Sequence, residues 1–184
     1  MSEFFDELLA KHCDFIEEQQ LFTVATAPTK GRINLSPRGL DSFRIINSKR
    51  VAWLDLVGSG NETAAHLKEN GRITIMFMSF TRNPLIMRLY GAGYAVHPGD
   101  DEFDEYIGLF TNMRGVRQIM IVDIDNLQTS CGYGVPRADN VRARPTLEKW
   151  AESKDEDELY DYQMQKNVRS IDGLDTGLFD KKKR

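Results

Sequence analysis

The sequence predicts a mainly-β protein, an antiparallel barrel with peripheral helices. Short β-rich segments follow one another at intervals of roughly 8 to 15 residues, which favours an antiparallel barrel over a βαβ sheet. The 184 residues are 41% hydrophobic and 28% charged, close to the average for globular proteins. A chain of this length can bury a core without disulfides or a metal, so we expect a single domain over residues 1–184.

Three parts follow one another along this domain. Apolar side chains at helical spacing predict an N-terminal helix within residues 1–20. The barrel occupies residues 21–135, and C-terminal helices with a tail occupy residues 145–184. We expect the acidic residues between 152 and 161 to form a solvated helix face.

The barrel is predicted to begin with a hairpin, because β-rich residues 21–27 and 32–39 flank the turn sequence Pro-Thr-Lys-Gly. Short helices over residues 61–71 and 100–110 interrupt the strands. The other predicted strands are residues 43–47, 51–56, 72–80, 84–96 and 116–125.

Charge and cysteine content limit the possible functions. The net charge of −4 argues against a nucleic-acid-binding surface, and we interpret the terminal Lys-Lys-Lys-Arg as a frayed tail. Cys13 and Cys131 are too few for a disulfide framework, which predicts a reducing, cytoplasmic location, with Cys131 a buried structural residue. Neither a signal peptide nor an apolar membrane span is evident, so we expect a protein that is neither exported nor inserted.

The loop before the predicted helix at residues 61–71 is a candidate anion site. It leads from a strand through Gly58 and Gly60 into a helix that Asn61 can cap, so backbone N–H groups point ahead of the helix. An ordinary helix start is the alternative, because Glu62 in the first turn can itself satisfy the helix dipole.

Two strand positions support the anion site. Ser36 supplies a hydroxyl and Arg38 a planar guanidinium suited to a phosphate, and both can converge with a helix N-terminus on one dianion. Taken alone, Arg38 would more often be a surface arginine. Arg88 lies within an apolar strand, where a cation needs either a ligand or an ion-pair partner.

Other chemistries lack the residues they need. The histidines His12, His66 and His97 are far apart in sequence and are expected on helix or turn surfaces, so no metal site is predicted. Gly91 and Gly93 inside a strand are expected to mark a bulge, where a flat ring or a partner approaches closely.

Several motifs occur in order between about residue 20 and residue 175. They are Ser-Pro-Arg-Gly at 36–39, Trp53 within a strand, Gly-Asn-Glu-Thr at 60–63 opening a helix that ends Lys-Glu-Asn-Gly, Arg88 three residues before Gly91, and the later TSCGYGVP, LEKWAESK and NVRSIDGL. This order resembles the pyridoxamine 5'-phosphate oxidase-like FMN-binding split-barrel family. The later motifs are similar to a bacterial subgroup described only as pyridoxamine phosphate oxidase-related.

The resemblance implies a six-stranded antiparallel split barrel that forms a homodimer with FMN at the subunit interface. It implies that Ser36 and Arg38 contact the flavin phosphate or ribityl chain. By the same resemblance, Asn61, Glu62 and Thr63 form the loop-to-helix segment that holds the phosphate.

The resemblance also assigns residues near the flavin ring. Trp53 and Leu54 match the strand beside the isoalloxazine, and Arg88 lies near the ring-contacting strand position. Arg117 and Tyr133 would reach the flavin of the other subunit.

This chain departs from the family's founding oxidase at two places. The oxidase has a basic Ser-Arg-Lys where this chain has Asn61-Glu62-Thr63, and it carries a C-terminal Arg/His-rich substrate motif that this chain lacks. True pyridoxamine 5'-phosphate oxidase activity is therefore not expected.

Three functional hypotheses remain from the sequence. The first is an FMN-dependent oxidoreductase with a small-molecule substrate, in which the cofactor carries the hydride chemistry. The second is a non-catalytic flavin-binding or stress-associated protein, and the third is a split barrel that binds haem or a deazaflavin. A homodimer is expected in each case, because strand faces carrying Trp53, Met76, Met78, Met87 and Tyr90 hold more apolar area than one interior can take.

Overall fold

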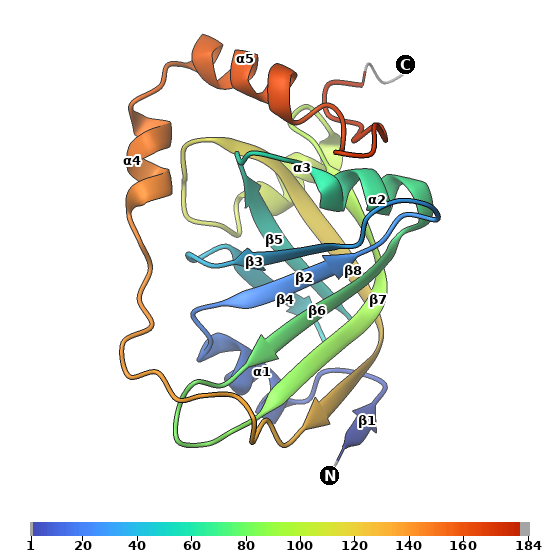
Figure 1. Ribbon diagram of the computed structural model, residues 1–184, viewed down its shortest axis with the longest axis vertical. Coiled ribbons are helices and arrows are strands. Elements are labelled where there is room, and N and C mark those ends of the chain that lie inside the picture. Colours follow the sequence, from blue (N-terminus) through green and yellow to red (C-terminus); the bar gives the residue numbers. More distant parts are fainter. Residues whose placement is uncertain (1, 181–184) are drawn as a thin grey trace.

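The computed structural model describes residues 2–180, so the basic tail at 181–184 lies outside the described residues. An antiparallel sheet of eight strands curls into an open barrel (Figure 1). The strand order is β3 (Asn34–Arg38), β2 (Phe22–Thr26), β6 (Arg72–Met78), β7 (Ile86–Val96), β8 (Val116–Ser130), β5 (Arg50–Leu56) and β4 (Phe43–Asn47), and β1 (Glu3–Phe5) pairs with β8. Because β3 and β4 are the two ends of this order, the barrel is split between them. The predicted antiparallel, mainly-β fold is confirmed, with eight strands rather than six.

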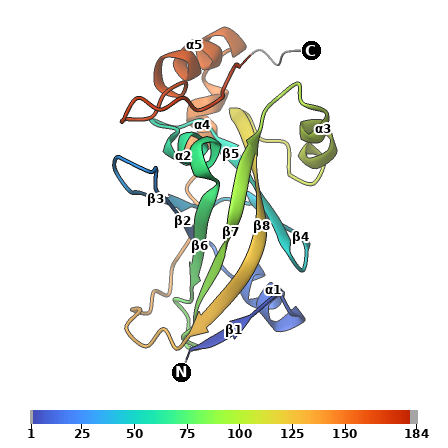
Figure 2. The ribbon, with the colours of Figure 1, turned by 90° about the vertical axis from the view of Figure 1, so that its right-hand side faces the viewer.

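Helices cover both ends of the barrel. The helix α2 (Glu62–Asn70) and the helices α4 (Thr146–Glu152) and α5 (Glu156–Lys166) lie toward one end, and α1 (Ala10–Glu17) lies toward the other (Figure 2). The helix α3 (Asp101–Ile107) packs beside β8. The six acidic residues between 152 and 161 are exposed, as predicted for a solvated face.

The N-terminal prediction was wrong in part. Residues 3–5 form strand β1, and helix α1 begins only at Ala10. The reason lies in β8, which continues to Ser130 instead of ending at residue 125. Strand β5 pairs with β8 only as far as Asp123, and β1 pairs with β8 further along, at Leu127 to Thr129.

The core lies on both faces of the sheet. In β5, Trp53 points into the barrel interior and Leu54 points to the opposite face, where α3 packs. Both side chains are buried, so residues 51–54 of β5 form a continuous apolar run instead of an alternating pattern. The two faces therefore belong to two separate apolar clusters, joined by the same strand.

Two groups of sequence predictions need correction. Trp53 and Met87 are buried within the single chain and do not form a surplus apolar face, whereas Met76 is half-buried. His12 and His66 are also buried instead of lying on surfaces. His12 accepts a hydrogen bond from the Leu9 N–H, and His66 bonds the Thr26 hydroxyl, so local polar partners allow both rings to enter the interior.

The predicted bulge at Gly91 is confirmed. The pairing of β7 with β8 shifts between Tyr90 and Gly91, and a Cβ at Gly91 would lie 2.0 Å from the backbone oxygen of Asp123. The close neighbour is the chain's own strand β8.

Replacing Gly91 with alanine should therefore destabilise the fold. We expect a loss of about 1–3 kcal/mol in the free energy of unfolding, because the added methyl group meets backbone that cannot rotate away. Urea denaturation measures the change. The control is Gly108→Ala, where a Cβ meets nothing within 4 Å; equal stability of the two variants would contradict the prediction.

Candidate functional site

A buried carboxylate joins the two sides of the split. The side chain of Asp55 on β5 is fully buried, and its Oδ1 lies 2.6 Å from Nη1 of Arg38 on β3. Its Oδ2 lies 2.9 Å from Nη2 of Arg117 and accepts a hydrogen bond from Gln118 at 2.7 Å. Gln118 also donates to Asn61. We call these five residues the Asp55 cluster.

The cluster carries an excess of positive charge, with two guanidinium groups to one carboxylate. Burial opposes the charge of Asp55, but the nearby Arg117 and Arg38 outweigh it and hold the pKa of this carboxyl below its ordinary value. Arg117 is almost completely buried, whereas 21% of the Arg38 side chain is exposed. Of the two arginines, Arg38 is therefore the one that a ligand can reach from solvent.

The N-terminus of α2 lies beside this cluster. Asn34 on β3 donates hydrogen bonds to Ser36 at 3.0 Å and to Thr63 in the first turn of α2 at 3.3 Å. Within the described residues, the backbone N–H groups at 62–64 donate no hydrogen bond, and the Arg38 Nε is buried without a partner. We call Asn34, Ser36 and Thr63 the polar patch.

Strand β3 has an inverted pattern that explains this patch. Its polar residues Asn34, Ser36 and Arg38 are half-buried and share the face toward α2 and β5, whereas Ile33 and Leu35 are exposed. The unpaired Nε of Arg38 and the first N–H groups of α2 thus lie near the polar side chains of β3, an arrangement suited to a phosphate or another anion.

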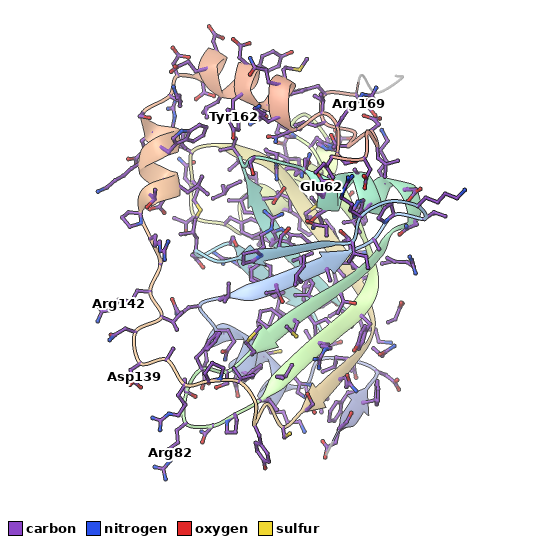
Figure 3. The ribbon with its side chains drawn as sticks, in the orientation of Figure 1. Glu62, Arg82, Asp139, Arg142, Tyr162 and Arg169 are labelled. Carbon is purple, nitrogen blue, oxygen red and sulfur yellow. The ribbon has the colours of Figure 1, made fainter. Side chains whose placement is uncertain are left out.

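The C-terminal segment, residues 167–180, packs against the same end of the barrel. Asn61 donates to the Asn167 backbone oxygen at 3.1 Å, and Asn167 in turn donates to the Gly58 oxygen at 2.8 Å. The Glu62 carboxylate accepts the Ile171 N–H at 3.0 Å. Figure 3 shows Glu62 and Arg169 close together at this end. Glu62 is therefore occupied as an anchor of the C-terminal segment, a role that sequence reasoning missed.

The remaining predicted site residues are either covered by the chain or lie away from the polar patch. Trp53 and Leu54 are covered by the chain itself, and Arg117 is held by Asp55 and by the Gly60 oxygen at 2.7 Å. Arg88 is half-buried, 3.5 Å from the Ser130 hydroxyl. Tyr133 is 82% exposed.

Cys131 is exposed, so the prediction of a buried cysteine was wrong. It follows the last residue of β8, where the chain leaves the sheet. No group of metal-ligating side chains occurs among residues 2–180, and no helix in this part of the chain is long and apolar enough to cross a membrane.

Acid should weaken the fold through Asp55. Because its pKa is lower in the folded than in the unfolded chain, the carboxylate contributes stability above the unfolded pKa near 3.9, and this is lost as the pH falls further. We expect the free energy of unfolding to fall as the pH drops below about 5, more steeply in the wild type than in Asp55→Asn. Urea unfolding across this range measures both slopes; parallel slopes would contradict the assignment.

An open antiparallel barrel with a buried arginine–carboxylate cluster at its split defines the structural class. The family model of pyridoxamine 5'-phosphate oxidase matches residues 8–131. A pyridoxamine 5'-phosphate oxidase family protein of Aspergillus flavus, ustO, is 41% identical over 95% of this chain and 77% of its own length. The chain belongs to the pyridoxamine 5'-phosphate oxidase family.

Solved structures agree with this fold. HupZ of Group A Streptococcus has a TM-score of 0.52 at 23% identity, covering 65% of this chain and 91% of that chain. A provisionally named pyridoxamine 5'-phosphate oxidase of Lactobacillus delbrueckii has a TM-score of 0.53 at 13% identity, covering 67% of this chain and 94% of that chain. At these identities the likeness extends to the fold alone.

Proposed function

We propose that this chain binds FMN and works as an FMN-dependent oxidoreductase on a small molecule. The observation that carries the proposal is Arg38, whose buried Nε has no hydrogen-bond partner and which lies beside the polar patch at the start of α2. Membership of the pyridoxamine 5'-phosphate oxidase family supports a flavin as the anion that this cluster receives. Bound FMN would supply the hydride chemistry.

The protein's own residues would bind and orient the cofactor. Arg38, Ser36 and Thr63 would hold the terminal phosphate together with the first N–H groups of α2. Asp55 and Arg117 would keep the Arg38 guanidinium in place. Glu62 and Asn61 would act on the phosphate only indirectly, because their side chains bind the C-terminal segment.

We also propose a cytoplasmic homodimer with a shared flavin site. The exposed Leu35 on the edge strand β3 and the exposed Ile33 just before it support a partner surface next to the polar patch. Arg88 and Tyr133 would contact the flavin ring from the partner. Because the side chains of Trp53 and Leu54 are buried, these two residues would contact the ring only through backbone atoms. Light scattering with flavin fluorescence at falling protein concentration tests this: a monomer that retains FMN refutes the shared site.

Flavin occupancy is tested by the absorption spectrum. Purified protein should show oxidised flavin bands and release FMN rather than FAD on heating. A colourless protein whose thermal stability does not rise with added FMN would refute the proposal, because a specific ligand must stabilise the folded state.

Replacing Arg38 with alanine should weaken FMN binding by about 1.5–3 kcal/mol, the range for a lost charge-assisted hydrogen bond. Titration followed by flavin fluorescence measures the affinity, with circular dichroism to confirm folding. The matched control is Arg82→Ala, because Arg82 is exposed and lies at the opposite end of the barrel (Figure 3). Equal FMN affinity in both variants would make Arg38 a structural arginine only.

A further inference from the structure

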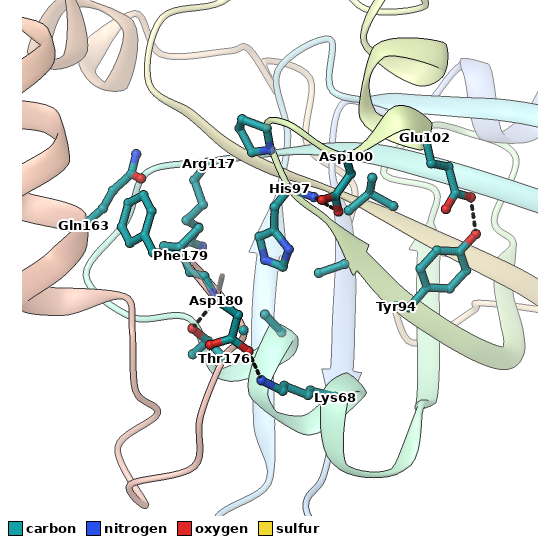
Figure 4. Close-up of a pocket in the computed structure, with 16 residues that line it drawn as sticks. Lys68, Tyr94, His97, Asp100, Glu102, Arg117, Gln163, Thr176, Phe179 and Asp180 are labelled. Atoms are coloured by element: carbon teal, nitrogen blue, oxygen red, sulfur yellow. Dashed lines mark hydrogen bonds and ion pairs between the residues drawn. The ribbon is translucent and has the colours of Figure 1, made fainter. Parts of the chain in front are cut away.

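A second cavity lies on the other side of α2, between that helix, the end of β7, α3 and the C-terminal segment (Figure 4). Its volume is about 510 Å³, which is within the range of small-molecule sites. Part of its wall is residues 176–180, which lie beyond the family match at 8–131. The FMN proposal does not use this cavity, and of its lining residues only Ala64 and Arg117 belong to both regions.

The charges around the cavity favour a cation. Its lining carries the carboxylates of Asp100, Glu102 and Asp180, against the two cations Lys68 and Arg117. Each cation is already paired: Lys68 binds Asp175 as well as Asp180, and Arg117 binds Asp55. Negative charge therefore exceeds positive charge in and immediately around the lining.

The histidine at the centre of Figure 4 does not change this balance. Burial lowers the pKa of His97, so its imidazole is neutral at pH 7. An anion such as a phosphate ester would meet a surplus of carboxylates here, whereas an ammonium group would be attracted.

The apolar part of the wall suits an aromatic ring. The side chains of Val96, Leu178 and Phe179 line the cavity. Phe179 adopts a φ of +67°, a conformation that bulky residues rarely take, and its ring packs on Tyr160 with the centroids 4.8 Å apart. Aromatic rings also attract a nearby cation through their faces.

One polar side chain in the wall is available to a ligand. Gln163 on α5 lines the cavity, and no hydrogen bond joins its side-chain amide to another of residues 2–180. A ligand hydroxyl can therefore pair with this amide. In Figure 4, Gln163 and Glu102 lie on opposite sides of the cavity, so a ligand can reach both with different ends.

We propose that this cavity binds a small aromatic amine, with its ammonium group toward the carboxylates, its ring against Phe179, and a polar substituent on Gln163. The site is separate from the flavin site and does not depend on the proposed function. A failed amine titration with intact FMN binding would overturn this assignment alone, and the reverse result would overturn only the FMN proposal.

The test is calorimetric titration of the full chain, in the presence of FMN, with three matched probes. Tyramine carries the ring, hydroxyl and ammonium; phenethylamine lacks the hydroxyl; 3-(4-hydroxyphenyl)propanoate keeps ring and hydroxyl with the opposite charge. Tyramine should bind saturably and at least about tenfold more tightly than the carboxylate, as one lost charge interaction corresponds to that factor. The proposal is overturned if tyramine does not saturate a site, or if 3-(4-hydroxyphenyl)propanoate binds as tightly as tyramine.

Variants locate the site. Glu102→Gln should weaken tyramine about tenfold, whereas Glu105→Gln, on the exposed face of the same helix, should leave it unchanged. Gln163→Leu should lower the affinity for tyramine to that for phenethylamine, and melting temperatures confirm that each variant is folded. Equal tyramine affinity in the two glutamate variants, or an unchanged affinity in Gln163→Leu, places the amine elsewhere and overturns the assignment.

Discussion

Replacing Asp55 with asparagine should lower the free energy of unfolding by about 3–5 kcal/mol, the range for breaking a buried ion pair from one side. The carboxylate is fully buried and is shared by Arg38 and Arg117, so its loss leaves Arg117 charged in the interior with no carboxylate beside it. Urea denaturation at pH 7 measures the effect. Exposed ion pairs contribute much less, and Asp123→Asn, which breaks the exposed pair with Arg50, should cost about 0–1 kcal/mol.

A second substitution separates charge from packing at this position. If the loss arises from an uncompensated arginine, adding Arg117→Met to Asp55→Asn should recover part of the stability, because the buried charge is removed together with its partner. A double variant less stable than the single one would mean that the Arg117 hydrogen bond to the Gly60 oxygen matters more than the ion pair.

Replacing Trp53 with alanine should cost about 3–5 kcal/mol, as for other large buried side chains. The indole is fully buried in the barrel interior and packs edge-on against Phe22, with ring centroids 6.1 Å apart. Thermal or urea unfolding measures the loss. The control is Trp150→Ala on α4, where the indole is only half-buried, and a comparable loss there would contradict the difference in burial.

The same position tests the sequence-based assignment of Trp53 to the flavin ring. Trp53→Phe keeps an aromatic side chain in the core, so FMN affinity should change little if Trp53 serves only packing. A large loss of FMN affinity in a folded Trp53→Phe protein would instead place the flavin against this strand.

Local sequence patterns predicted most of the elements but not their partners. The hairpin of β2 and β3 and the position of the start of α2 were placed correctly, although the Asn61 side chain makes no capping hydrogen bond and binds Asn167 and Gln118 instead. Strand β1 could not be found, because Glu3–Phe5 is extended only through its pairing with the distant end of β8.

Burial of polar residues was equally hard to predict. Nothing in the residues around Arg117 predicts that its side chain is buried. Its burial depends on Asp55, which lies 62 positions away in sequence. The candidate anion site was recognised from Ser36, Arg38 and the loop before α2, which the fold does bring together. The sequence offered one clue to Asp55. It is a charged residue within an apolar strand, where a buried charge needs a partner.

The C-terminal segment and helix α2 belong to the same folding unit. The family match stops at residue 131, yet Asn167, Ile171 and Asp175 bind Asn61, Glu62 and Lys68, which belong to α2 or cap it. A chain cut at the family boundary would expose these polar groups and remove one wall of the second cavity. Local opening of α2 and detachment of the last residues should therefore be a single cooperative event, so that the end of the family-model match and the boundary of the folding unit do not coincide.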